Sequence, residues 1–148
     1  MLIPMKTPVA LATLLLAGLL SLHAGPRTAA GPRGGRLLGQ AAPRAEFVVE
    51  KDRTVRLTFY DAQLKPVPVS GQAAAVVAEA RNGRARLEFE RKDDALVSTG
   101  KLPAGDGYLV VVQLQNAPGA KPQNYRFRLE LHDCSGCKLA EYACTCAH

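Results

Sequence analysis

The chain contains no tryptophan, and none of its four cysteines lies before residue 134. Immunoglobulin domains of the antibody type depend on a buried tryptophan beside a disulfide that joins their two sheets, so that subtype is excluded. Histidine is almost as scarce, since only His132 and His148 lie beyond residue 30 and both flank the cysteines. A serine nucleophile therefore has no separate histidine base, and we expect no enzymatic activity.

Acidic residues are absent from the first 45 positions, whereas basic residues are not. The whole chain carries 19 lysines and arginines against 13 aspartates and glutamates, a formal net charge of +6. Five of the basic residues precede residue 45, so 14 basic and 13 acidic residues remain beyond it. The high pI of the whole chain therefore reflects residues 1–44 and not the domain that follows them. A domain with a net charge so close to zero lacks the excess of basic residues that is typical of proteins that bind nucleic acid.

The chain has one long apolar run, over residues 9–20, and Lys6 precedes it. About a dozen apolar residues are too few to span a bilayer core of roughly 30 Å. A positive residue, a short apolar core and small residues after it are typical of a signal peptide. We predict a signal peptide over residues 1–30, cleaved after Ala24 or Ala30, with an uncleaved membrane anchor as the alternative. The mature protein is then periplasmic or secreted and has no membrane span.

Beyond the leader, apolar and polar residues alternate with a period of two, and no helical periodicity of useful length occurs. This alternation predicts half-buried strands. Asn82-Gly83 is the strongest hairpin signal, whereas Pro66 and Pro68 restrict their segment to an edge or a loop. The predicted strands cover residues 47–49, 53–60, 73–79, 84–90, 95–99, 108–115 and 125–131. Their number and spacing predict an all-β fold, an immunoglobulin-like antiparallel β-sandwich of about seven strands over residues 31–131.

Three short segments carry a resemblance to known proteins. Residues 31–35 read Gly-Pro-Arg-Gly-Gly, residues 45–49 read Ala-Glu-Phe-Val-Val, and residues 61–67 read Asp-Ala-Gln-Leu-Lys-Pro-Val. They resemble a group of exported bacterial β domains with a Gly-Pro-His-Gly-Gly opening, a His-x-Glu-Phe/Leu-Val strand and an Asp-x-x-Gly-Lys-Pro-Val turn. Segments related to these domains occur near periplasmic adaptor subunits of heavy-metal efflux systems.

The resemblance implies that residues 31–38 form the first strand of the domain, whereas their composition alone predicts a flexible linker. The chain departs from the group's pattern at three positions. Arg33 and Arg44 stand where the group often has histidine, and Leu64 replaces the turn glycine. We therefore expect no metal site at that end of the domain.

The C-terminal region contains all four cysteines in the motif Cys-x2-Cys-x6-Cys-x-Cys, at Cys134, Cys137, Cys144 and Cys146. The first spacing allows a tight turn that aims both sulfurs at one point, and residues i and i+2 of an extended segment share a face. The six intervening residues suffice for a hairpin or one helical turn. Four converging thiolates suit a closed tetrahedral zinc site, or a softer ion such as Cu(I). We predict that these four cysteines are metal ligands.

In an exported chain the same cysteines could instead form two disulfides, which would stabilise the folded tail by about 2–3 kcal/mol. A bond between Cys144 and Cys146 would be strained, so disulfides would join the two halves of the motif or include Cys134–Cys137. Thiol redox exchange at Cys134–Cys137 is a third interpretation, although the strand–motif–helix context of thioredoxin-like proteins is missing. His132, on the polar face of a strand end, is best explained by solvent exposure, and it and the terminal His148 are substitute ligands if one cysteine is spare.

We expect residues 132–148 to form a separate cysteine-rich tail, because every core candidate lies between Phe47 and Leu131. The β domain should then fold without the tail. The predicted function is an exported β-sandwich that binds a zinc-like or soft metal ion through its four cysteines, for a structural, sequestration or delivery role. The alternative is a metal-free structural or interaction module with two disulfides in the tail and a protein partner in the cell envelope.

Overall fold

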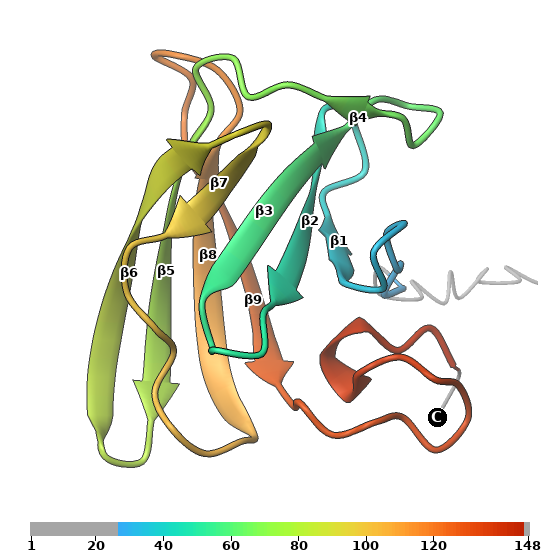
Figure 1. Cartoon of the computed structure of the whole chain (residues 1–148), viewed down its shortest axis with the longest axis vertical. Coiled ribbons are helices and arrows are strands. Elements are labelled where there is room, and N and C mark those ends of the chain that lie inside the picture. Colours follow the sequence, from blue (N-terminus) through green and yellow to red (C-terminus); the bar gives the residue numbers. More distant parts are fainter. Residues whose placement is uncertain (1–26, 147–148) are drawn as a thin grey trace, which may run out of the picture.

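The computed structural model describes residues 27–146, in which the regular structure consists of β-strands and one 3-10 turn (Figure 1). The strands are β1 (Arg36–Leu38), β2 (Arg44–Val49), β3 (Val55–Tyr60), β4 (Pro66–Val67), β5 (Ala73–Ala80), β6 (Gly83–Lys92), β7 (Ala95–Ser98), β8 (Tyr108–Gln115) and β9 (Gln123–Leu129). The turn, η1, covers Glu141–Ala143. The all-β prediction is confirmed, and each of the seven predicted strands overlaps an observed one.

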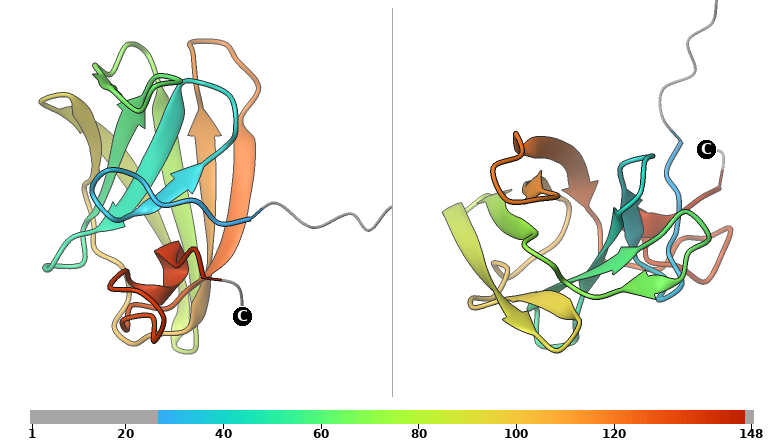
Figure 2. Two further views of the ribbon diagram at one scale, coloured as in Figure 1. Left: turned by 90° about the vertical axis from the view of Figure 1, so that its right-hand side faces the viewer. Right: turned by 90° about the horizontal axis from the view of Figure 1, so that it is seen from above.

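All nine strands belong to one antiparallel sheet with the order β1-β2-β3-β7-β6-β5-β8-β9, and β4 pairs with β3. Strand β6 connects the two halves of this path, because its residues up to Glu88 pair with β5 and those from Phe89 onward pair with β7. The sheet curls until β9 approaches β2, so it is nearly closed into a barrel (Figure 2). The predicted immunoglobulin-like sandwich is not confirmed, because the strands form one continuous curled sheet.

The period-two alternation places one face of each strand inside the barrel. In β3, the predicted inward residues Val55, Leu57 and Phe59 are all fully buried. Strand β8 lies between β5 and β9, in agreement with the central position that its early apolar residues predict. Pro66 lies in β4, a two-residue strand that pairs only with β3. The local patterns therefore predict the strands and their inner faces correctly.

The glycine-rich loop before β1 closes around the side chain of Glu46, which is fully buried. The backbone N–H groups of Arg33 and Gly35 donate to Glu46 Oε1 at 2.9 and 2.8 Å, and the Tyr60 hydroxyl donates to Oε2 at 2.7 Å. Burial and the adjacent carboxylate raise the pKa of Tyr60, so its hydroxyl keeps the proton that it donates. Gly31 has no room for a side chain, because a Cβ atom would lie 2.3 Å from Glu46 Cδ. The flexible linker predicted from composition is therefore wrong. Of residues 31–38, for which the resemblance implies a strand, only Arg36–Leu38 form one, and the residues before them form an ordered loop.

The turn between β3 and β4 holds a leucine in a backbone conformation that favours glycine. Leu64 has a φ of 58°, and the Asp61 carboxylate accepts the N–H groups of Gln63 and Lys65, both at 2.9 Å. A left-handed conformation costs a non-glycine residue roughly 1–2 kcal/mol. The turn therefore holds Leu64 in a backbone conformation that a glycine would adopt without this cost.

The barrel is incomplete between β9 and the β1–β2 pair, and we call this gap the seam. Among the described residues no strand pairing joins its two sides. Aromatic side chains meet across it instead, since the rings of Phe47 and Phe127 lie edge to face with centroids 5.2 Å apart. Arg36 adds a cation–π contact, with its guanidinium carbon 4.7 Å from the centre of the Phe127 ring. Side chains thus close the seam in place of backbone hydrogen bonds.

The C-terminal tail packs against one end of the seam (Figures 1 and 2). Tyr142 is a buried member of the core, and its ring centroid lies 5.9 Å from that of Phe47 and 6.4 Å from that of Phe127. Its hydroxyl accepts the Val49 N–H at 3.2 Å, and its carbonyl accepts Arg36 Nη1 at 3.1 Å. The prediction that every core residue precedes the tail is therefore wrong, because the tail supplies an aromatic ring that fills the gap between β2 and β9.

Replacement of Glu46 tests the buried carboxylate. Glu46→Leu leaves the N–H groups of Arg33 and Gly35 without their acceptor, at about 1–3 kcal/mol for each buried donor. We expect the free energy of unfolding, measured by urea denaturation, to fall by about 3 kcal/mol or more. The control is Glu50→Gln, because Glu50 forms a partly exposed pair with Arg56 whose loss should cost less than about 1 kcal/mol. Equal effects of the two substitutions would contradict the role assigned to Glu46.

Replacement of Tyr142 tests whether the tail belongs to the core. Tyr142→Ala removes a buried ring, and we expect a loss of about 3–5 kcal/mol in the free energy of unfolding. Tyr142→Phe keeps the ring but leaves the Val49 N–H without its acceptor, so a loss of about 1–2 kcal/mol is expected. Both are measured by urea denaturation with a chelator present, which removes any contribution of a metal ion. A Tyr142→Ala variant as stable as the parent would mean that the tail only lies on the surface.

Candidate metal centre

The tail brings the sulfur atoms of all four cysteines to one point. The Sγ atoms of Cys134, Cys137, Cys144 and Cys146 lie within 4.8 Å of one another, and residues 27–146 contain no second group of this kind. Cys134 and Cys144 are buried, whereas Cys137 and Cys146 are partly exposed. The ligand set predicted from the motif is thus assembled in the fold, and the cluster could hold a metal ion.

A short turn shapes the first half of the motif. The N–H of Cys134 donates to the Leu139 carbonyl at 2.8 Å, which brings the ends of the turn together. Gly136 has no room for a side chain, because a Cβ atom would lie 2.9 Å from Cys146 Sγ. The glycine inside the first cysteine pair therefore lets the second pair approach.

The turn η1 lies between the two cysteine pairs, and of the hairpin or single helical turn that the six-residue spacer allows, the structure has a helical turn. The N–H of Ala143 donates to the Ala140 carbonyl at 2.9 Å, and the N–H of Cys144 donates to the Glu141 carbonyl at 3.1 Å. The backbone at Cys144 is already extended, which places Cys144 and Cys146 on one face. The N–H of Cys146 also donates to Cys144 Sγ at 3.3 Å, a contact that by itself lowers the pKa of Cys144.

The cluster is anchored to the barrel through its spacer. The N–H of Tyr142 donates to the Glu130 carbonyl at 3.0 Å, and the N–H of Glu141 donates to the His132 carbonyl at 2.8 Å. The ring of Tyr142 also lies in the core. Sequence reasoning did not identify Tyr142 as an anchor, although an aromatic residue in the six-residue spacer was a signal for it.

The spacing of the sulfurs suits a four-coordinate ion. A zinc–sulfur bond of about 2.3 Å gives a regular tetrahedron of four sulfurs with edges of about 3.8 Å. The Sγ atoms of Cys137 and Cys144 are 3.7 Å apart, close to this edge. A disulfide needs a separation of about 2.05 Å, and no disulfide joins the four cysteines. Smaller movements are therefore needed to reach tetrahedral coordination than to form two disulfides.

The four thiols change one another's affinity for protons. A backbone hydrogen bond from Leu139, followed by contacts with the neighbouring sulfurs, lowers the pKa of Cys137 against the opposing effect of burial. The hydrogen bond with Cys134, together with burial, raises the pKa of Cys144 to about 12. The hydrogen bond with Cys144 would lower the pKa of Cys146, but contacts with Cys137 and Cys134 raise it above its ordinary value. Cys144 and Cys146 therefore keep their protons at neutral pH, and a metal ion that bound there would have to displace them.

A hollow of about 210 Å³ lies beside the second cysteine pair and is lined by Arg27, Thr28, Cys144, Thr145 and Cys146. Four thiolates around a divalent ion would carry excess negative charge, and Arg27, which lines the same hollow, is a cation on that side of the cluster. The hollow also gives solvent a route to the second cysteine pair.

His132 is not part of the cluster. Its Nδ1 lies 3.3 Å from Asp106 Oδ2, and its side chain is 61% exposed, in agreement with the solvent-exposed position expected at a strand end. Burial would raise the pKa of Asp106, but hydrogen bonds from the N–H groups of Leu131 and Gly107 and from His132 lower it. The second histidine candidate, His148, lies outside the described residues.

No family model, no curated protein and no solved structure matches the chain. The resemblance to exported bacterial β domains therefore stays a prediction. No helix in residues 27–146 is long and apolar enough to cross a membrane. The fold and the site together define an all-β domain, nearly closed into a barrel, with a cluster of four cysteines that could bind a metal ion.

Proposed function

We propose that the protein binds one zinc ion through Cys134, Cys137, Cys144 and Cys146. The observation that carries this proposal is the convergence of four sulfur atoms within 4.8 Å of one another. The separation of 3.7 Å between two of them supports tetrahedral coordination. A shell of four thiolates has no open position and is typical of structural zinc sites.

A structural role has the strongest support, because the loop that carries the cysteines also carries Tyr142 into the core. An ion bound by this loop stabilises the folded state by favouring the conformation in which the tail is docked. The partial exposure of Cys137 and Cys146 supports exchange of the ion as well. A soft ion such as Cu(I) would use the same sulfurs in a sequestration or delivery role.

The role is binding rather than catalysis. His132 is the only histidine in residues 27–146, and it is paired with Asp106. A closed shell of four sulfurs also leaves no coordination position for a substrate.

Two disulfides are the alternative in an oxidising compartment. The sulfurs of Cys137 and Cys144 belong to different halves of the motif and lie 3.7 Å apart, which favours a bond between these two. The tail would then be stapled without a metal ion, and the protein would act as a structural or interaction module of the cell envelope.

Export belongs to the same proposal, with the N-terminal signal removed and the protein working in the periplasm or outside the cell. Cleavage after Ala24 fits the contacts of the domain better than cleavage after Ala30. The Leu37 N–H donates to the Ala29 carbonyl at 2.8 Å, and Ala30 bridges to Arg36. Cleavage after Ala30 would remove this extra pairing with β1.

Metal binding is tested on the reduced, purified protein. We expect one zinc ion per chain by elemental analysis and four sulfur ligands at about 2.3 Å by X-ray absorption. Cys134→Ser or Cys146→Ser removes one of the four sulfurs and should weaken zinc binding by more than about 100-fold. His132→Ala is the matched control and should leave the affinity unchanged.

The affinity for zinc should rise between about pH 6 and about pH 8, because binding releases the thiol protons and does so more easily as their concentration in solution falls. Protein isolated from its native compartment with neither reactive thiols nor bound metal would overturn the metal proposal and support the disulfide alternative.

Intact mass of the exported protein tests the signal peptide. We expect a mature chain that lacks residues 1–24, since the pairing of Ala29 and Ala30 with β1 is then retained. Retention of Met1 would contradict export by cleavage. A mature chain that begins at Gly31 would contradict the choice of Ala24.

A further inference from the structure

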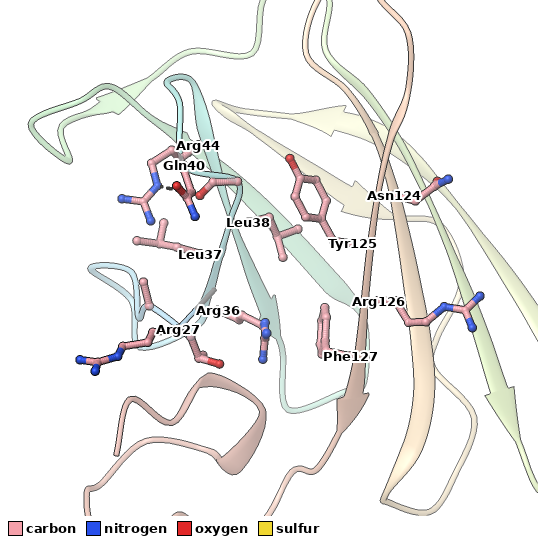
Figure 3. A pocket seen from close by; sticks show the side chains of 13 residues that line it. Arg27, Arg36, Leu37, Leu38, Gln40, Arg44, Asn124, Tyr125, Arg126 and Phe127 are labelled. Atoms are coloured by element: carbon pink, nitrogen blue, oxygen red, sulfur yellow. Dashed lines mark hydrogen bonds between the residues drawn. The ribbon is translucent and has the colours of Figure 1, made fainter. Parts of the chain in front are cut away.

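A hollow of about 370 Å³ lies on the seam, between β1 and β9 (Figure 3). Its apolar wall includes Leu38, Tyr125 and Phe127, and none of the residues that line it is acidic. The side chain of Arg36 reaches across the hollow toward Phe127 (Figure 3). A concave site with an apolar wall and one well-placed charged group is typical of sites for small amphipathic ligands.

Arg36 is a half-buried charge that has no counterion among the described residues. Its guanidinium lies over the Phe127 ring, and Nη1 donates to the Tyr142 carbonyl at 3.1 Å. It forms no ion pair with a carboxylate of residues 27–146. Burial lowers the pKa of Arg36, as expected for a cation that has lost part of its hydration. A bound anion would offset this loss of hydration.

The two contacts of Arg36 also orient it. The Phe127 ring supports one face of the guanidinium, and the Tyr142 carbonyl occupies one of its five N–H donors. The donors that remain are held in a fixed fork, which is the arrangement that binds a carboxylate through two parallel hydrogen bonds.

We propose that the hollow on the seam binds a small organic anion that has a carboxylate group and an apolar body. The carboxylate pairs with Arg36, and the apolar body lies against Leu38, Tyr125 and Phe127. Arg44 lines the same hollow, with its Nε donating to the Gly39 carbonyl at 3.2 Å, and adds positive charge. A volume of about 370 Å³ is at the small end of the range for ligand pockets, which limits the ligand to a small molecule such as a medium-chain carboxylate. None of the cysteines lines this hollow.

An extended peptide fits these observations less well. A peptide that bound as a strand across the seam would need the backbone edges of both β1 and β9. The outer edge of β1 is already occupied, because the Leu37 N–H donates to the Ala29 carbonyl and Ala30 bridges to Arg36. The observations therefore favour a small molecule.

Calorimetric titration of the purified protein with octanoate tests this site. We expect saturable binding of one octanoate per chain, with octanol at least about tenfold weaker because it cannot form the ion pair. Arg36→Gln should weaken octanoate binding at least about tenfold, and Arg36→Lys should weaken it less because the charge is kept. Arg126→Gln is the matched control, since Arg126 lines the hollow but its side chain points away from it (Figure 3), and it should leave the affinity unchanged.

Chemical modification of the unaltered protein gives a readout that does not depend on the folding of a variant. Phenylglyoxal reacts with accessible guanidinium groups, and octanoate should protect Arg36 but not Arg126 when the modified peptides are analysed by mass spectrometry. Octanoate that fails to bind, or that binds Arg36→Gln as well as the parent, would overturn the proposal. Protection of Arg36 by an acidic peptide but not by octanoate would assign the hollow to a peptide and would also overturn it. The metal content of each sample is measured separately, so the outcome is independent of the proposed metal centre.

Discussion

A sheet that does not close must cover its two edges, and in this protein side chains cover them. Strands β1 and β9 end the sheet without pairing with each other. Phe47 and Phe127 meet in the gap, and Tyr142 packs against both rings. Arg36 lies over Phe127 and donates to the Tyr142 carbonyl. The docking of the tail, the position of the cysteine cluster and the hollow on the seam all depend on this incomplete closure.

The strands could be predicted from the sequence, but the closure could not. Period-two alternation reports which residues of a strand face inward, and it predicted Val55, Leu57 and Phe59 correctly. It carries no information on which strands pair. The sheet becomes continuous because β6 pairs with β5 along its first half and with β7 along its second. The residues of β6 alternate uniformly through this change of partner, so the pattern does not separate a curled sheet from a sandwich.

The part of the candidate site that lies within one short segment of the chain could be predicted from the sequence. The convergence of the cysteines follows from their spacing within a short segment, and this prediction matches the fold. For the spacer the sequence left a hairpin and a helical turn open, and the structure has the helical turn. Tyr142 was missed because its burial depends on Phe47 and Phe127, which are distant in sequence. Glu46 was missed for the same reason. Its position in a strand would leave it exposed, but the glycine-rich loop before β1 folds over it and supplies two N–H donors.

The contact between Tyr142 and β2 has a consequence for the order in which the chain folds. The Val49 amide and the Tyr142 hydroxyl are 93 residues apart in sequence. A ribosome or a translocation channel releases the chain from its N-terminus, so β2 emerges long before the aromatic ring that completes its part of the core. Until Tyr142 emerges, Phe47 and Phe127 are only partly covered, and the unpaired edge of β9 can pair with other chains. The interval of greatest exposure to aggregation therefore ends only when the cysteine-bearing segment arrives, which makes docking of that segment the last step in burying the core.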